Sequence, residues 1–205
     1  MPFEVFSFPK FRTIFSISRG SLKKTELFKS TFNFSSAVFA CCRDAVASAK
    51  RKGVDKNDIV AISHSNQGIT MVLLDENEKP VRDRTIGWQD LRYVDILPEL
   101  QKEVDMDKYW NISGMMFGTY NIPILRWLQQ NEPENWAKVR YICSHQDWFL
   151  RQYGATGFFI DEGCTNFLSM ANKETNEWDD YLTSVYHVDK NTLPKVIHTP
   201  GTVVG

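Results

Sequence analysis

The segment DIVAISHSNQGITMVLLDENEKPV, residues 58–81, decides the expected fold of this 205-residue chain. Its first eight residues are typical of a buried strand that ends in a polar turn, SHSNQG. The apolar run after the turn predicts two further strands, which are joined by polar residues between Asp75 and Pro80. The segment therefore predicts several strands that follow one another closely.

Helical periodicity surrounds these strands. The apolar residues of 36–53 recur on one helical face, and Gly53 suits the end of that helix. Further helices are expected over 91–104, with a break or late start at Pro98, and over 121–134, 146–154 and 176–188. Strands are expected over 139–145 and 157–161. Strands that alternate with helices indicate an α/β architecture.

The helix expected within 121–134 has its own start signal. Asn121 is a candidate cap, and Pro123 suits the first turn. Ile124, Leu125 and Leu128 share one face, which we expect to be buried. Residues 1–35, by contrast, show no clear period. We leave them unassigned, as a non-native or disordered segment, and expect the domain over 36–205.

Composition excludes several classes of protein. Hydrophobic residues make up 42% and charged residues 24%, and the net charge of −1 predicts neither nucleic-acid nor membrane binding. The first residues do not have the pattern that predicts a secretory signal. The sequence contains no GxxxxGK[ST], GxGxxG or HExxH motif. The four cysteines lack zinc-site spacing, so no metal site is predicted. Reduced thiols fit a cytoplasmic protein.

Two short stretches carry candidate binding residues. In an α/β sheet, ligands collect beyond the carboxyl ends of strands, where the turn at 63–68 is expected to lie. Gln67 offers both donors and acceptors to a sugar or polyol, and Gly68 allows close backbone approach. His64 and His145 end predicted strands and are weaker candidates. The alternative is an ordinary polar turn.

The second stretch is RDRTIGWQDLRYVD, residues 82–95. The indole of Trp88 can contact the C–H face of a sugar, and Asp90 can accept hydrogen bonds from two hydroxyls. Arg92 can hold the carboxylate of Asp90. The alternative is a helix start, at which acidic residues are favoured by the helix dipole.

Four blocks follow one another along the chain. The first is the strand–turn segment 58–81 with its Trp–x–Asp–x–Arg signature at 88–92, and the others are SGMMFGTYNIPILRWLQQNEPENWAKV, ICSHQDWFLRQYGATGFFID and TNEWDDYLTSVYHVDKNTLPKVIHTPGTVVG. In this order they resemble the FGGY carbohydrate kinases. The resemblance covers about residues 36–205. It implies an incomplete first domain of a ribonuclease H-like, actin-like ATPase fold in a two-domain sugar kinase.

The resemblance also implies function. Such kinases transfer the γ-phosphoryl group of ATP, with Mg²⁺, to a hydroxyl of a sugar or polyol. Gln67, Trp88 and Asp90 would form the sugar-facing wall, supported by Arg92 and Gly68, and a homo-oligomer is compatible with the family. The family's phosphate loop and catalytic Asp find no match in this sequence, so the catalytic base is expected beyond residue 205 and the isolated chain is expected to be inactive. The alternatives are a non-catalytic remnant or fragment with at most sugar binding, and another actin-like ATPase.

Overall fold

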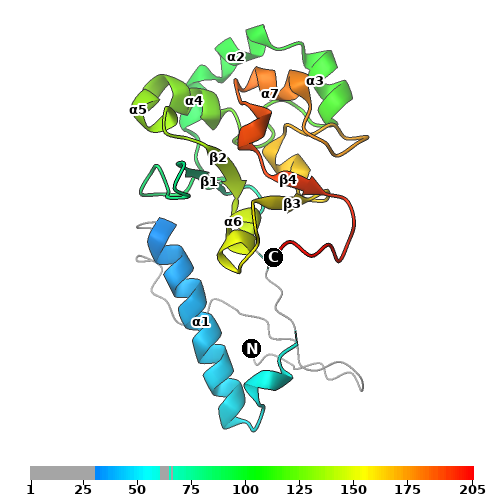
Figure 1. Cartoon of the computed structure of the whole chain (residues 1–205). Helices are drawn as coiled ribbons and strands as arrows, with labels where there is room; N and C mark the ends of the chain where they lie inside the picture. Colours follow the sequence, from blue (N-terminus) through cyan, green and yellow to red (C-terminus); the bar gives the residue numbers. More distant parts are fainter. Residues whose placement is uncertain (1–30, 61–64, 66) are drawn as a thin grey trace. The chain divides into compact units, whose positions relative to one another are not determined.

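The computed structural model describes residues 31–60, 65 and 67–205 (Figure 1). Contacts divide the chain into two compact units, Met1–Asn66 and Gln67–Gly205, which are described separately. The expectation for residues 1–30 lies outside the described residues, as do His64 and the rest of 61–64 within the strand expected over 58–65.

Helix α1 dominates the described part of the first unit. It spans Thr31–Arg51 and therefore starts five residues before the expected position at 36. Lys50 and Arg51 lie in its last turn, where cations favour the helix dipole, and Gly53 follows with a φ of 82°. The expected C-terminal signal is thus confirmed. A short 3₁₀ turn, η1 (Lys56–Asp58), comes next.

The second unit contains two small sheets (Figure 1). Strand β1 (Met71–Leu74) pairs antiparallel with β2 (Tyr141–Ser144), with Met71 opposite Ser144. Strand β3 (Phe159–Asp161) pairs parallel with β4 (Lys195–Ile197). All four residues of β1 are buried, as an apolar run predicts.

The strand expected after the polar turn at Asp75–Pro80 is wrong as a continuous strand. Only two isolated bridges remain on that side of β1, Leu74 with Pro80 and Met71 with Ile86. The chain bends between them because Arg82 turns to form an ion pair with Glu132. Charged residues at 82–84 cannot continue a strand beside the buried β1 without the loss of their hydration.

The helices of the second unit cover 92–192 in short pieces. They are η2 (Arg92–Ile96), α2 (Leu97–Glu103), α3 (Met106–Ser113), α4 (Ile124–Asn131), α5 (Pro133–Trp136), α6 (His145–Gln152), η3 (Thr165–Leu168), α7 (Asp180–Val185) and η4 (Lys190–Thr192). The late start predicted from Pro98 is confirmed, since Pro98 lies in the first turn of α2.

Helix α3 was not predicted from the sequence, although it carries clear end signals. The carboxylate of Asp105 accepts a hydrogen bond from the Lys108 backbone N–H at 2.9 Å, and Gly114 ends the helix with a φ of 70°. Helix α7 begins at Asp180, four residues later than expected, because the Asp179 side chain caps it.

The prediction that Asn121 caps α4 is wrong. Pro123 precedes the helix, no side chain caps it, and the Asn121 amide instead donates to the carbonyl of Gly87. The buried face is confirmed, because Ile124, Leu125 and Leu128 are at most 1% exposed.

The core of the second unit joins both sheets to α2, α3, α4 and α7. It includes Met71, Leu73, Ile86, Leu100, Tyr109, Ile122, Leu125, Leu128, Ile142, Ile160, Leu168, Leu182 and Tyr186. Tyr109 of α3 and Tyr186, just after α7, share a hydrogen bond of 2.7 Å between their buried hydroxyls. Within the described residues, none of the helices combines the length and apolar character that a membrane span requires.

Candidate functional site

The two stretches singled out in the sequence emerge at the same end of β1. Met71 and Ile86 exchange reciprocal backbone hydrogen bonds of 2.9 and 3.0 Å. Because this pair is antiparallel, the residues before Met71 and those after Ile86 leave at one edge. Ser144, the last residue of β2, lies opposite Met71 at that edge. The fold therefore collects Gln67–Thr70, Gly87–Asp90 and the start of α6 at one end of the sheet.

Gln67 lies exposed in the first of these turns. Its side-chain carbonyl accepts a hydrogen bond of 3.1 Å from the hydroxyl of Thr70, which is 2% exposed. This contact orients the amide, so that its NH₂ group remains available as a donor. A sugar hydroxyl or carbonyl oxygen is an acceptor of the matching kind.

Gly68 has a packing explanation. A Cβ at this position would lie 2.5 Å from two ring atoms of Phe167, which is closer than real contacts allow. We expected Gly68 to let a ligand approach the backbone, but the Phe167 ring occupies the space beside it. The glycine allows η3, which carries Phe167, to pack against the 67–70 turn.

Trp88 remains half exposed, at 51% of its surface. Its turn is closed by a hydrogen bond of 2.9 Å from the Asp90 N–H to the carbonyl of Gly87. An exposed indole on a tight turn offers a flat apolar surface for a ligand.

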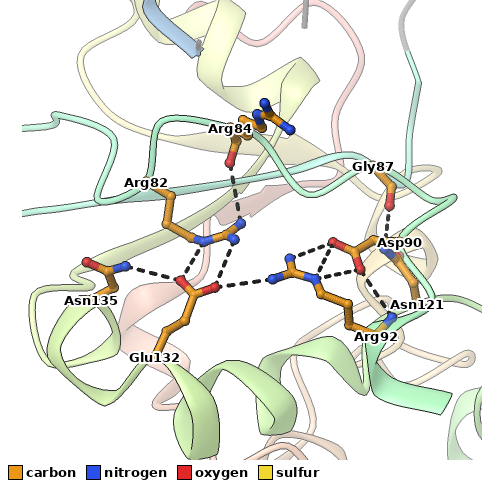
Figure 2. Close-up of polar contacts among 8 residues, drawn as sticks. All are labelled: Arg82, Arg84, Gly87, Asp90, Arg92, Asn121, Glu132 and Asn135. Atoms are coloured by element: carbon orange, nitrogen blue, oxygen red, sulfur yellow. Dashed lines mark hydrogen bonds and ion pairs between the residues drawn. The ribbon is translucent and has the colours of Figure 1, made fainter. Parts of the chain in front are cut away.

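Asp90 and Arg92 form a bidentate ion pair (Figure 2). Arg92 Nη2 lies 2.6 Å from Asp90 Oδ2, Arg92 Nε lies 2.9 Å from Oδ1, and the Arg92 backbone N–H also donates to Oδ1 at 3.2 Å. Burial alone raises the pKa of Asp90, but the hydrogen bonds and charge of Arg92 outweigh it, so the pKa falls below its ordinary value. Asp90 is thus ionised, and most of its acceptor capacity is used by Arg92.

The helix-start alternative is partly realised. The 3₁₀ turn η2 begins at Arg92, and the Asp90 carboxylate accepts its first backbone N–H. Asp90 is therefore both a partner of Arg92 and a local turn residue, which favours a positioning role over direct contact with two hydroxyls.

Glu132 extends the network and was missed in the sequence analysis. Its carboxylate accepts two hydrogen bonds from Arg82, at 2.8 and 2.9 Å, one from Arg92 at 3.2 Å and one from Asn135 at 3.1 Å (Figure 2). Burial raises the pKa of Glu132, but these donors lower it overall. Arg92 also lies over the Trp127 ring, 4.4 Å from its centroid. The only sequence signal was the NEPE turn.

The start of α6 supplies buried polar groups to the same edge. His145 is 6% exposed, and burial lowers its pKa to about 4, so the ring is neutral at physiological pH. Burial raises the pKa of Asp147 to about 7, although Ser144 donates to its carboxylate. Gln146 donates to Asp161, and Cys164 donates to Gln146 at 3.1 Å. None of the described residues forms a group of three or more ligating side chains that could hold a metal ion.

Comparison with known proteins identifies the class. Residues 31–204 match the N-terminal domain of the FGGY family of carbohydrate kinases, and the chain belongs to that family. The match starts five residues before the expected boundary at 36. The predicted family is thereby confirmed.

Individual relatives agree. The chain is 27% identical over 143 residues to a xylulose kinase of Lactococcus lactis, with 69% of this chain and 28% of the relative covered. It is 32% identical over 154 residues to a glycerol kinase of Rhizobium meliloti, with 72% and 31% covered. The chain thus spans about a third of the length of these curated relatives.

Solved structures confirm the fold. A ligand-bound xylulose kinase from Lactobacillus acidophilus matches with a TM-score of 0.69 at 20% identity, covering 83% of this chain and 34% of that one. A Plasmodium falciparum glycerol kinase with ADP matches with a TM-score of 0.67 at 17% identity, covering 89% and 37%. The predicted ribonuclease H-like, actin-like ATPase fold is therefore confirmed as a partial domain.

Proposed function

We propose that this chain forms part of the sugar-binding domain of an ATP-dependent kinase that phosphorylates a hydroxyl of a neutral sugar or polyol. The observation that carries the proposal is the convergence of Gln67 and Trp88 at one end of β1, on a domain of the carbohydrate kinase family. Relatives named xylulose kinase and glycerol kinase support a small, neutral, hydroxyl-rich substrate.

The two exposed side chains have complementary chemistry. The indole of Trp88 contacts the C–H face of the ligand, and the oriented NH₂ group of Gln67 donates to a ligand oxygen. Asp90 and Arg92 hold the Trp88 turn, and any remaining acceptor position of Asp90 receives a hydroxyl. Gly68 supports the Gln67 turn through its contact with Phe167.

ATP and Mg²⁺ belong to the proposal for the whole enzyme. A solved relative contains ADP, but the described residues of this chain offer no metal-binding cluster. When bound, ATP and Mg²⁺ supply the phosphoryl group and neutralise its charge. The described residues bind and orient the sugar, and the catalytic base is assigned to another part of the enzyme. A cytoplasmic location and the absence of nucleic-acid or membrane partners complete the proposal.

A thermal-shift panel on the 205-residue chain tests the proposal. Glycerol, pentuloses and hexoses are compared with their phosphates, because a ligand that binds only the native state raises the melting temperature. We expect a concentration-dependent rise for at least one neutral compound and a smaller rise for its phosphate. No rise with any neutral compound would contradict the proposal.

A further inference from the structure

We propose that Asn121 and Glu132, which flank α4, are positioning residues that hold the Trp88 turn in its sugar-binding geometry. The inference rests on the proposed function for the role of Trp88. Neither residue belongs to the Trp–x–Asp–x–Arg signature, and each acts on Trp88 through another group.

The first anchor precedes α4. The Asn121 side-chain NH₂ donates to the carbonyl of Gly87 at 2.7 Å, directly before Trp88 (Figure 2). Asn121 is 2% exposed, and its Oδ1 is buried with no hydrogen-bond partner among the described residues. An unsatisfied buried acceptor destabilises a fold. Among the described residues, the Gly87 carbonyl is the one hydrogen-bond partner of the Asn121 side chain, so this side chain serves the turn.

The second anchor follows α4. Glu132 comes directly after the last residue of the helix and binds Arg92, whose guanidinium also lies over Trp127 in the middle of α4. Arg92 in turn holds Asp90 at both carboxylate oxygens. Glu132 therefore reaches the distal end of the turn through Arg92.

The two anchors act on opposite ends of one short segment. Gly87 precedes Trp88, and Arg92 follows it. Asn121, before α4, holds Gly87, and Glu132, after α4, holds Arg92. Helix α4 is rigidly seated, because Ile124, Leu125 and Leu128 are at most 1% exposed. The helix consequently serves as a fixed support for an exposed indole.

The carboxylate of Glu132 has no spare capacity. Oε1 accepts from Arg82 and Arg92, and Oε2 accepts from Arg82 and Asn135, so each oxygen receives two hydrogen bonds. In Glu132→Gln, one oxygen becomes an NH₂ group that faces cationic donors. The substitution keeps the side-chain size and breaks part of the network.

The test combines amide hydrogen exchange with sugar binding on the 205-residue chain. The variants are Asn121→Leu, which is close in size and removes the donor, and Glu132→Gln. Matched controls are Gln129→Met, which removes an amide donor to the Tyr186 carbonyl, and Glu78→Gln, which alters the bidentate pair with Arg151. Exchange is read from a peptide covering residues 86–93.

We expect both variants to exchange about three- to tenfold faster in that peptide, and to bind the neutral ligand about three- to tenfold more weakly, whereas the controls match the wild type. Unchanged exchange in both variants would overturn the inference, even where the wild type binds a sugar. Faster exchange with unchanged sugar affinity would also overturn it, because the residues would then be structural only. A wild type that binds no neutral sugar refutes the proposed function separately, and the exchange result still decides whether α4 holds the turn.

Discussion

Arg92 forms a bidentate ion pair with Asp90, two residues earlier in the chain, with Nη2 2.6 Å from Oδ2 and Nε 2.9 Å from Oδ1. The pair closes the segment that follows Trp88, so an acid that the sequence suggests as a sugar ligand also stabilises the local fold. This relationship joins the two interpretations of the stretch, a ligand wall and a helix start.

Asp90→Asn should lower the free energy of unfolding by about 0.5–1.5 kcal/mol at neutral pH, because the pair is partly exposed to solvent. The pKa of Asp90 is lowered in the folded state, so the carboxylate stabilises the fold above its ordinary pKa and loses this effect as the pH falls. Urea unfolding at about pH 7 and about pH 3 measures the difference. Asp95→Asn, at an exposed position of η2, is the control. A loss that is equal at both pH values would show that the ion pair is not its source.

Gly68→Ala should cost about 1–3 kcal/mol of stability, because its Cβ would meet the Phe167 ring at 2.5 Å. The cost should shrink in a Phe167→Ala background, where the ring is absent. Gly157→Ala is the matched control, since a Cβ there would lie 3.5 Å from the Phe159 ring, an ordinary contact. Equal costs in both backgrounds would mean that Gly68 is required for a reason other than Phe167.

His198 should give the fold a pH-dependent contribution. Its Nε2 lies 2.7 Å from Glu177 Oε1 and its Nδ1 lies 3.2 Å from Glu162 Oε2, and these hydrogen bonds raise its pKa. A raised folded pKa means that the stabilisation is complete below the ordinary value near 6.5 and disappears as the pH rises through the folded pKa. The melting temperature of the wild type should therefore exceed that of His198→Gln at about pH 6, and the two should converge by about pH 9. A difference that stays constant over this range would contradict the assignment.

The four cysteines should be free thiols of unequal reactivity. Cys143 is fully buried, which raises its thiol pKa, and burial together with Asp161 raises the pKa of Cys164 to about 12. Iodoacetamide at about pH 7.5 should leave Cys143 and Cys164 unmodified in the folded chain and alkylate all four cysteines in urea. We expect no disulfide between the adjacent Cys41 and Cys42, because such a bridge strains the backbone. Intact mass under non-reducing conditions tests this, since a Cys41–Cys42 disulfide would lower the mass by about two units.

The sequence predicted those elements whose signals are local. The apolar run at Met71–Leu74, the late helix start at Pro98 and the buried face of α4 are all confirmed. The strand predicted after the Asp75–Pro80 turn does not form, because Arg82 pairs with Glu132, 50 residues away, and the chain leaves the sheet there. The prediction that Asn121 caps α4 also failed because of a contact distant in sequence: its amide donates to the carbonyl of Gly87, 34 residues earlier.

The candidate site was predictable in part. Trp88 and Gln67 stood out through residue type and position relative to strands, and the structure places both at one end of β1. Their sugar-binding role stays a prediction. Glu132 and Phe167 could not be found in the same way, because the roles of a carboxylate in a charged turn and of an aromatic residue in a short 3₁₀ helix follow only from the contacts that they make.

The central claim is that the exposed indole of Trp88 forms the sugar-binding wall of this domain. Isothermal titration of the best neutral ligand from the panel into the wild type, Trp88→Ala and Trp110→Ala tests it most directly. Trp110 on α3 is also 51% exposed, so its substitution removes a comparably exposed indole from a different element. We expect Trp88→Ala to weaken binding at least about tenfold, as the loss of roughly 1.4 kcal/mol of contact implies, and Trp110→Ala to bind like the wild type. Equal affinity in all three proteins would contradict the account.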